Sequence, residues 1–297
     1  MGIYQSKPVT TKTTYSGEAS DLLFAVASMQ GWRNALEDTW ITIPDFAQDV
    51  SLFGVFDGHG GPEVAKFCAK YFPIELEKST YFQSQDYKTA LEKTCIRMDA
   101  LLLSQAGQEL YREFSKGKGT GLLTGCTAII ALITSREIYI ANAGDSKAFI
   151  SKGENEIISL STDHLPNVKS ERARIKSAGG YVSEGRVNDS LNLTRSIGDL
   201  QFKQNSALGL EQQIITSFPD VTQIARQDSK MLILGCDGIW EKYPEAEIFE
   251  RLGVKMETAT SKEMTESIAT LFDSLLAKDT MEGVGCDNMT CVLIRFK

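Results

Sequence analysis

Apolar residues along this chain gather mainly in short runs that are rich in valine, isoleucine and phenylalanine and are bounded by polar or glycine-containing turns. Runs of this length and composition are typical of buried β-strands. The predicted strands cover residues 24–28, 39–43, 51–56, 127–133, 137–141, 146–151 and 231–236, with a last strand after Asp287. Residues 142–145 have the composition of a tight turn, so we expect the strands on either side of them to pair as an antiparallel hairpin.

Several segments between these runs have the 3.6-residue period of helices. One begins at Pro62 and continues through Cys68. A second covers residues 86–104, and its apolar face consists of Ala90, Leu91, Thr94, Cys95, Met98, Leu101 and Leu102. A short basic helix is expected to end at Gly179, another to cover residues 244–252, and the last to begin at a capping box formed by Thr260 and Glu263.

The chain is expected to form one domain preceded by a flexible segment. Residues 1–22 are polar and have no strong periodicity, which predicts a flexible N-terminal segment. No linker rich in proline or serine and no block of like charges divides residues 23–297. A length of 297 residues would also allow two domains, but sandwiches and barrels often reach this size as one.

The charge balance of the chain disfavours nucleic acid as a partner. The chain has 31 lysines and arginines against 39 aspartates and glutamates, a net charge of −8. A general nucleic-acid surface needs clustered basic residues, so we expect no nucleic-acid partner. An acidic chain is compatible with a site that holds cations.

The cysteines and the hydropathy indicate a cytosolic protein. The six cysteines lie mostly within apolar runs and lack the short paired spacing of a zinc site, which predicts reduced core cysteines. The N-terminus has no apolar signal region, and the longest apolar runs, such as residues 126–133, are far too short to span a bilayer.

The first residues match an acylation pattern. Gly2 follows the initiator methionine and Ser6 stands at the position where the N-myristoylation pattern has serine or threonine. The alternative is an unmodified disordered tail. A single acyl chain with only Lys7 and Lys12 nearby would give reversible membrane association.

Isolated carboxylates stand at the ends of apolar runs. Asp57 and Asp237 each end a run, and Asp287 precedes the last one. Taken alone, the pair Asp57-Gly58 is a common turn signal. A β-sandwich could bring such ends together, and carboxylates that close would repel one another unless cations lay between them. Oxygen ligands without a set of histidines or thiolates favour magnesium or manganese over zinc.

Further charged residues lie in the loop of residues 33–38 and beside Asp57. Arg33 could grip a phosphate group by paired hydrogen bonds, and Glu37 and Asp38 could serve a hard cation. A charged loop is, however, usually only a solvated surface. His59 is one of only two histidines in the chain, the other being His164.

Two polar stretches are candidates for parts of a site. The glycine-rich residues 114–126 fail as a nucleotide-binding loop, because no strand leads into them and no helix follows them. A flexible connection is the better interpretation, and it disfavours a nucleotide-hydrolysing enzyme. The polar residues 163–210 could form a mobile flap over a site.

Several motifs occur in the order in which one enzyme family has them. They are Arg33 with ALEDT (residues 35–39), FGVFDGHGG (53–61), NAGDS (142–146), the DH and ERxRIxxxGG pattern (163–180), TRSIGD (194–199), CDGIW (236–240) and CDNMT (286–290). With this set the sequence resembles the metal-dependent Ser/Thr protein phosphatases of type 2C, over roughly residues 24–296.

The resemblance implies an α+β fold, a four-layer α-β-β-α sandwich in which two antiparallel sheets pack face to face between helices. It implies two Mg²⁺ or Mn²⁺ ions at one end of the sandwich. In the roles that the resemblance implies, Asp57 bridges both ions. The Gly58 carbonyl and a water bound by Glu37 serve one ion, and Asp237 and Asp287 serve the other. Asp38 would orient water, Arg33 would hold the phosphate and His59 would protonate the leaving oxygen.

The implied reaction is hydrolysis of phosphoserine or phosphothreonine by direct attack of a metal-bridging water, without a protein nucleophile. The partners would be phosphoproteins, and we expect a monomer. The alternative is a catalytically silent scaffold that keeps the fold and binds protein partners, although such a scaffold has no chemical need for this set of residues.

The sequence departs from the family pattern at five positions. They are Lys147, Leu165, Thr194, Ser196 and Glu241, which stand where arginine, lysine, serine, alanine and aspartate are usual. None of them removes a ligand of the two-metal centre. They bear on substrate contacts near the flap and on a third, weaker metal that Asp145 and Asp237 could hold.

Overall fold

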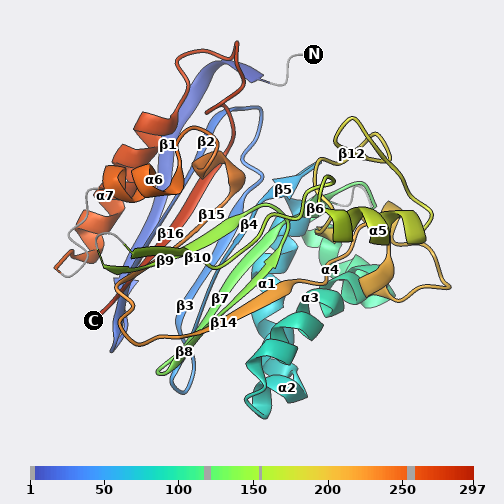
Figure 1. Cartoon of the computed structure of the whole chain (residues 1–297), viewed down its shortest axis with the longest axis horizontal. Helices are drawn as coiled ribbons and strands as arrows, with labels where there is room; N and C mark the ends of the chain where they lie inside the picture. Colours follow the sequence, from blue (N-terminus) through green and yellow to red (C-terminus); the bar gives the residue numbers. More distant parts are fainter. Residues whose placement is uncertain (1–3, 117–121, 154–155, 253–257) are drawn as a thin grey trace.

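The structure is a computed structural model that describes residues 4–116, 122–153, 156–252 and 258–297. Two antiparallel sheets pack face to face, and helices cover the outer face of each (Figure 1). This is the α-β-β-α sandwich that the sequence predicted. The position of Gly2, and with it the predicted acylation, lies outside the described residues.

The first sheet has six strands in the order β1-β2-β16-β15-β9-β10. Their bounds are Tyr4–Glu18, Leu22–Arg33, Met289–Phe296, Met231–Gly235, Lys147–Gly153 and Glu156–Ser159. Helices α6 (Glu245–Leu252) and α7 (Ser261–Leu275) lie on its outer face (Figure 1). The predicted capping box begins α7, since the Thr260 side chain accepts from the Glu263 backbone and the Glu263 side chain accepts from the Thr260 backbone.

The second sheet has five strands in the order β14-β8-β7-β4-β3. Their bounds are Asp220–Ala225, Glu137–Ala143, Ala128–Thr134, Val50–Phe56 and Thr39–Ala47. Its outer face is covered by α1 (Glu63–Lys78), α2 (Thr80–Gln83), α3 (Tyr87–Leu103) and α4 (Gln105–Ser115) (Figure 1). The predicted apolar face of residues 86–104 is buried in α3, as expected for core packing.

Short elements lie at one end of the sandwich. Strands β13 (Ile197–Gly198), β6 (Gly125–Cys126) and β5 (Gly58–His59) form a small sheet, and β11 (Val182–Ser183) pairs with β12 (Arg186–Val187). Helix α5 (Lys169–Ser177) lies nearby, followed by Gly179 at a φ of +90°. Single-turn 3₁₀ segments cover Leu200–Phe202, Leu210–Gln212 and Asp237–Ile239.

The prediction of a flexible segment over residues 1–22 is wrong for most of its length, because Tyr4–Glu18 forms β1. This strand pairs antiparallel with β2, and its last residues continue the ladder from Thr13 opposite Ser28 to Glu18 opposite Leu23. Backbone hydrogen bonds carry this pairing, so it needs no run of apolar side chains. An edge strand with polar side chains therefore has no strong sequence signal.

The prediction of a hairpin across residues 142–145 is also wrong. Both predicted strands exist, but β8 belongs to the five-stranded sheet and β9 to the six-stranded sheet. The turn between them thus crosses from one sheet to the other. Glycine and aspartate permit a sharp reversal in either case, so the local sequence cannot distinguish a hairpin from a crossover.

The core lies between the two sheets and under the helices. Across the sheet interface, the rings of Phe24 and Phe53 have centroids 5.5 Å apart. All six cysteines are buried and free, in agreement with the predicted reduced core cysteines. Among the described residues, no helix is both long and apolar enough to cross a membrane.

We expect Phe24→Ala to lower the free energy of unfolding by about 3–5 kcal/mol, because it removes a fully buried ring and leaves a cavity between the sheets. Urea denaturation measures this loss. Thr260→Ala, which removes only the cap of α7, should cost about 1 kcal/mol. A loss of similar size in both variants would contradict the placement of Phe24 at the centre of the core.

Candidate active site

A cavity of about 510 Å³ opens at one end of the sandwich. Eight residues singled out from the sequence line it: Arg33, Glu37, Asp57, Gly58, His59, Asp145, Asp237 and Asp287. Asp38 is buried and is absent from the lining. The structure thus brings together residues that are up to about 250 positions apart in the chain, as the sandwich hypothesis required.

Asp57 is fixed at the end of a buried strand. Strand β4 ends at Phe56, and the Asp57 carbonyl accepts a hydrogen bond of 2.8 Å from the backbone amide of Thr127. The Asp57 amide in turn donates to the Thr127 hydroxyl at 3.3 Å. Gly58 follows, and a Cβ atom there would lie 2.5 Å from the carbonyl oxygen of Glu37. Only glycine therefore permits the loop of residues 34–38 to pass this close.

Asp237 and Asp287 come from neighbouring strands of the other sheet. Strand β15 ends just before Cys236, and β16 starts just after Asn288. The two strands run antiparallel with Gly235 opposite Cys291, so the end of one and the start of the other share an edge. Ligand atoms of Asp237, Asp287 and Glu241 all lie within 4.8 Å of one another.

Glu241 was noted in the sequence only as a departure from the family pattern. Its carboxylate joins Asp237 and Asp287, and it accepts a hydrogen bond of 3.3 Å from the amide of Gly285. The available signal was its position directly after the CDGIW motif, four residues after Asp237. Its side-chain direction could not be read from that spacing alone.

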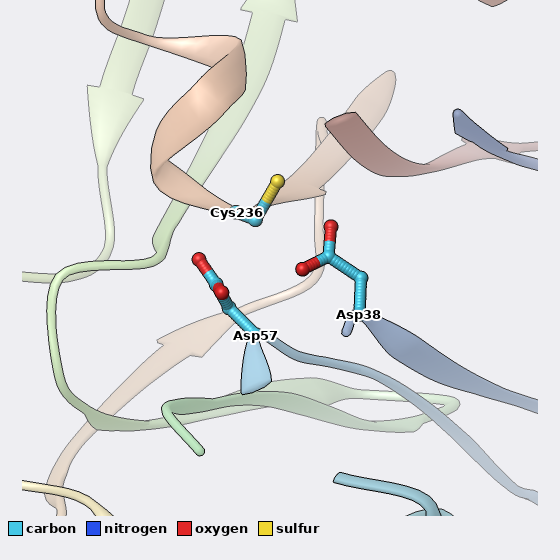
Figure 2. Close-up of side chains that lie close together, drawn as sticks. All are labelled: Asp38, Asp57 and Cys236. Carbon is cyan, nitrogen blue, oxygen red and sulfur yellow. The ribbon is translucent and has the colours of Figure 1, made fainter. Parts of the chain in front are cut away.

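A second cluster lies behind the cavity. Ligand atoms of Asp38, Asp57 and Cys236 lie within 4.8 Å of one another, and Figure 2 shows the two carboxylates beside the thiol. The Asp38 oxygens are buried, and neither has a hydrogen-bond partner of normal geometry among the described residues. Burial raises the pKa of the Cys236 thiol well above its usual range, so the thiol stays protonated.

The carboxylates of Asp38, Asp57 and Asp237 have raised pKa values. Burial raises the pKa of Asp38 to about 6. Burial, followed by the charges of Asp38 and Asp237, raises the pKa of Asp57 well above its usual range. The pKa of Asp237 is raised well above its usual range by burial and then by Asp145 and Asp287. Crowded acids with unpartnered oxygens fit a hard divalent cation, which would supply the missing positive charge.

The loop that carries Glu37 and Asp38 is attached to the start of β16 by one side chain. Asn288 donates hydrogen bonds to the carbonyls of Gln30 at 2.7 Å and Ala35 at 3.0 Å. Its side-chain oxygen accepts from the Glu37 amide at 2.9 Å. Burial raises the pKa of Glu37. Asn288 therefore places the loop carboxylates relative to its neighbour Asp287.

Arg33 lies at the end of β2 and forms an ion pair with Asp287. Burial lowers the pKa of Arg33, but the charge of Asp287 and its hydrogen bond outweigh burial and raise it on balance. The Arg33 Nε atom is buried and has no hydrogen-bond partner among the described residues. Arg33 as a whole lines the cavity with 41% of its side chain exposed, so its guanidinium can contact an oxyanion there.

His59 contacts an acid that sequence reasoning did not assign to the site. Its Nε2 atom lies 2.7 Å from Oδ2 of Asp199. Burial lowers the pKa of His59, whereas the charge and hydrogen bond of Asp199 outweigh it and raise the pKa on balance. Asp199 lies in the TRSIGD motif, but the residues are 140 positions apart, so no local spacing predicts this contact.

Asp145 lies in the crossover between β8 and β9. It is only 8% exposed, and burial raises its pKa. The neighbouring Lys147 lies 3.3 Å from Asp163 and 3.8 Å from Glu245. Because this turn crosses from one sheet to the other, it places Asp145 at the cavity.

Part of the predicted flap borders the cavity. Residues Arg186, Ser190, Leu191, Asn192 and Leu193 line it, whereas the mobility of residues 163–210 stays a prediction.

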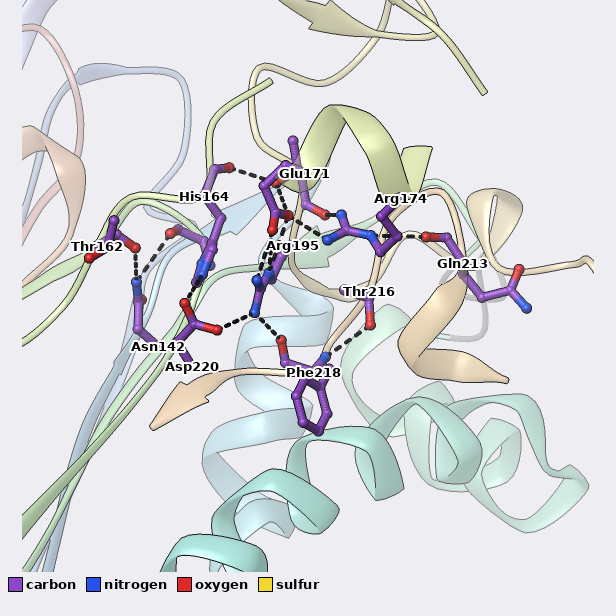
Figure 3. Close-up of polar contacts among 12 residues, drawn as sticks. Asn142, Thr162, His164, Glu171, Arg174, Arg195, Gln213, Thr216, Phe218 and Asp220 are labelled. Atoms are coloured by element: carbon purple, nitrogen blue, oxygen red, sulfur yellow. Dashed lines mark hydrogen bonds and ion pairs between the residues drawn. The ribbon is translucent and has the colours of Figure 1, made fainter. Parts of the chain in front are cut away.

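Figure 3 shows a polar network that attaches α5 to the strands. In it Glu171 is contacted by Arg174, by Arg195 at 2.7 Å and by the Thr194 hydroxyl at 2.6 Å.

Comparison with known proteins agrees with this site. The sequence matches the family Protein phosphatase 2C over residues 22–281. It is 43% identical over 301 residues to "Probable protein phosphatase 2C 3" of Paramecium tetraurelia, with all of both chains covered. It is 37% identical to "Probable protein phosphatase 2C 21" of Arabidopsis thaliana, with 100% of this chain and 93% of the relative covered.

A solved structure described as a phosphatase from a pathogenic strain of Toxoplasma gondii is similar to this fold, with a TM-score of 0.77, 25% identity and 96% of both chains covered. The serine-threonine phosphatase 2C of the same organism shares the fold at a TM-score of 0.77 and 18% identity, over 97% of this chain and 99% of that one. The chain therefore belongs to the protein phosphatase 2C family.

Proposed function

We propose that this protein is a metal-dependent protein serine/threonine phosphatase. The observation that supports this most directly is the convergence of Asp57, Asp237 and Asp287 on one cavity together with Arg33 and His59. Partly buried acids that lie this close repel one another and give a scaffold no benefit. The alternative of a silent partner-binding scaffold is therefore disfavoured.

The proposed cofactors are two Mg²⁺ or Mn²⁺ ions. Asp57 would be shared between them, the Gly58 carbonyl and a water held by Glu37 would complete one site, and Asp237 and Asp287 the other. When bound, the ions would activate a water molecule as nucleophile and neutralise charge on the phosphoryl oxygens. A weaker third ion would be held by Asp145 and Asp237, and the nearby Glu241 supports an acidic site there.

The protein groups around the ions would bind and orient the reactants. Arg33 would hold the phosphate through its terminal guanidinium nitrogens, released from Asp287. Asp38 would accept a hydrogen bond from the attacking water and orient it. His59 would donate a proton to the serine or threonine oxygen as it leaves. Phosphoproteins are the proposed substrates, and a cytoplasmic monomer is the proposed state.

Hydrolysis of phosphoserine and phosphothreonine peptides should require added Mg²⁺ or Mn²⁺, and Asp237→Ala should lower kcat/KM by more than about 100-fold, since it removes a proposed ligand. Phosphate release measures the rate. Asp45→Ala, which changes an exposed aspartate of β3, is the matched control and should keep wild-type activity. Full activity of Asp237→Ala would contradict the metal assignment, and a folded wild-type protein that binds metal without turnover would favour the scaffold.

The stability of the metal-free protein should fall as the pH rises from 5 to 7.5. The pKa values of Asp57, Asp237 and Asp38 are higher in the folded than in the unfolded chain, with that of Asp38 at about 6. The folded state therefore binds more protons in this window, and each group lowers stability by up to about 1.4 kcal/mol per pH unit until its folded pKa is passed.

Thermal unfolding at several pH values checks this expectation. Asp38→Asn should flatten the pH dependence because it removes one titrating group. Added Mg²⁺ should raise the Tm more at pH 7.5 than at pH 5, since it binds the ionised carboxylates. A metal-free protein that gains stability from pH 5 to 7.5 would contradict the assigned pKa directions.

We also propose that Gly2 carries a myristoyl group, on the pattern of Gly2 and Ser6. The intact mass of the protein from a eukaryotic host should then exceed that of the unmodified chain by one myristoyl group. Gly2→Ala should abolish the increase. An unmodified Gly2 in the wild-type protein would refute the proposal.

A further inference from the structure

The small sheet β13-β6-β5 places an acid beside the histidine of the cavity. In its register His59 of β5 is opposite Gly125 of β6, and Gly125 is opposite Gly198 of β13. Asp199 follows β13 directly. The carboxylate of Asp199 thus reaches across the middle strand to Nε2 of His59, at 2.7 Å.

The middle strand leaves room for this contact only because residue 125 has no side chain. A Cβ atom on Gly125 would lie 2.3 Å from Oδ2 of Asp199 and 2.7 Å from Nε2 of His59. Both distances are far below van der Waals contact, so any other residue would displace the carboxylate or the ring. Gly125 therefore leaves the space in which the Asp199 carboxylate contacts the His59 ring.

Asp199 is held rigidly in this position. It is 1% exposed and has a left-handed backbone with a φ of 49°, a conformation that few residues with a side chain adopt. Its amide donates to the carbonyl of Thr124 at 2.8 Å. Its Oδ2 accepts a second hydrogen bond, from the Ser196 hydroxyl at 2.5 Å.

A buried ion pair fixes the segment from the other side. Asp99 of α3 accepts from the Gly198 amide at 2.8 Å and from Lys203 at 2.5 Å. Lys203 also donates to the Ser196 carbonyl at 2.7 Å, and its side chain is fully buried. Burial raises the pKa of Asp199, but His59, Ser196 and Lys203 together outweigh it and lower the pKa, so the carboxylate stays charged.

We propose that Asp199 is a positioning residue that holds His59 with its Nε2 proton on the carboxylate and leaves Nδ1 to serve the substrate. Among the described residues Nδ1 has no hydrogen-bond partner, and the ring lines the cavity with 26% of the side chain exposed. A carboxylate on one ring nitrogen fixes the tautomer and orientation of a catalytic imidazole in many enzymes. This inference rests on the proposed role of His59 as the proton donor.

The proton balance of the step follows from this arrangement. As the bond between phosphorus and the serine oxygen breaks, the Nδ1 proton passes to that oxygen, and the serine leaves as an alcohol. The ring is then neutral and keeps its Nε2 proton on Asp199. It takes up a proton from solvent at Nδ1 before the next turnover.

The second histidine, His164, provides an internal comparison for the ring contacts of His59. His164 also faces an aspartate through Nε2, at 3.2 Å from Asp220. Its Nδ1 is already occupied, because it accepts a hydrogen bond of 3.2 Å from the Gly144 amide. His164 is 3% exposed and does not line the cavity. Both of its ring nitrogens are used structurally, whereas His59 has one nitrogen left.

Ser196 stands where the family pattern has alanine, and its hydroxyl is the second donor to Asp199. It fixes the rotamer of the carboxylate that His59 contacts. Ser196→Ala should therefore weaken the positioning of His59 less than Asp199→Asn does, because one of two hydrogen bonds to Asp199 remains.

The kinetic test compares a phosphoserine peptide, whose alkoxide needs a proton, with p-nitrophenyl phosphate, whose phenolate leaves without one. We expect Asp199→Asn to lower kcat about 10- to 100-fold on the peptide, with a much smaller loss on the aryl ester. Gly125→Ala should shift the ratio of the two rates in the same direction, and the control Asp220→Asn should leave that ratio unchanged. Equal losses on both substrates would overturn the proposal.

The structural test needs no activity. With only two histidines in the chain, ¹⁵N-labelled histidine gives two sets of ring signals in NMR, which His164→Gln assigns. In the wild type we expect His59 to carry its proton on Nε2 with a downfield-shifted resonance, and Asp199→Asn to move that resonance while His164 keeps its own. A resonance of His59 that Asp199→Asn does not change would overturn the proposal. An inactive wild type with the expected NMR signals would instead refute only the proposed phosphatase function.

Discussion

Repulsion between crowded, partly buried carboxylates constrains the end of the sandwich that contains the cavity. Asp57 comes from one sheet and Asp237 and Asp287 from the other. Burial and neighbouring carboxylates raise the pKa values of Asp57 and Asp237, and Asp287 has a ligand atom within 4.8 Å of one on Asp237. Buried like charges are costly unless a cation or proton offsets them. The scaffold therefore has to hold these acids together by covalent connection and packing, because nothing in their mutual interaction would do so.

The fold meets this demand at the strand ends. Strands β15 and β16 are hydrogen-bonded neighbours, so Asp237 and Asp287 cannot separate without breaking the ladder. Asp57 is hydrogen-bonded to Thr127, which lies between β6 and β7, and the packing of Phe24 against Phe53 keeps the two sheets in contact. The close approach at Gly58 removes the remaining freedom of the loop that carries Glu37. The packing that stabilises the core in this region therefore also fixes the geometry of the site.

Buried ion pairs next to the cavity have a different role. Asp99 and Lys203 are both fully buried, and such pairs contribute little net stability because desolvation offsets their attraction. Their value here is geometric, since together they hold the backbone of residues 196–199 beside β6. The network around Glu171 acts similarly on α5, where Arg174 and Arg195 outweigh burial and lower the pKa of Glu171 to about 2 (Figure 3).

The sequence by itself determined the features that depend on nearby residues. Periodicity identified α3, the capping box identified the start of α7, and the ends of apolar runs marked Asp57, Asp237 and Asp287, since each of these signals lies within a few positions. Only the tertiary structure decided which elements pair. Strand β1 is paired through its backbone, and the crossover after β8 has the composition of a hairpin. Glu241 and Asp199 reach the site through side-chain directions and contacts between distant segments. Such pairings and contacts depend on the topology of the whole chain, which local composition does not predict.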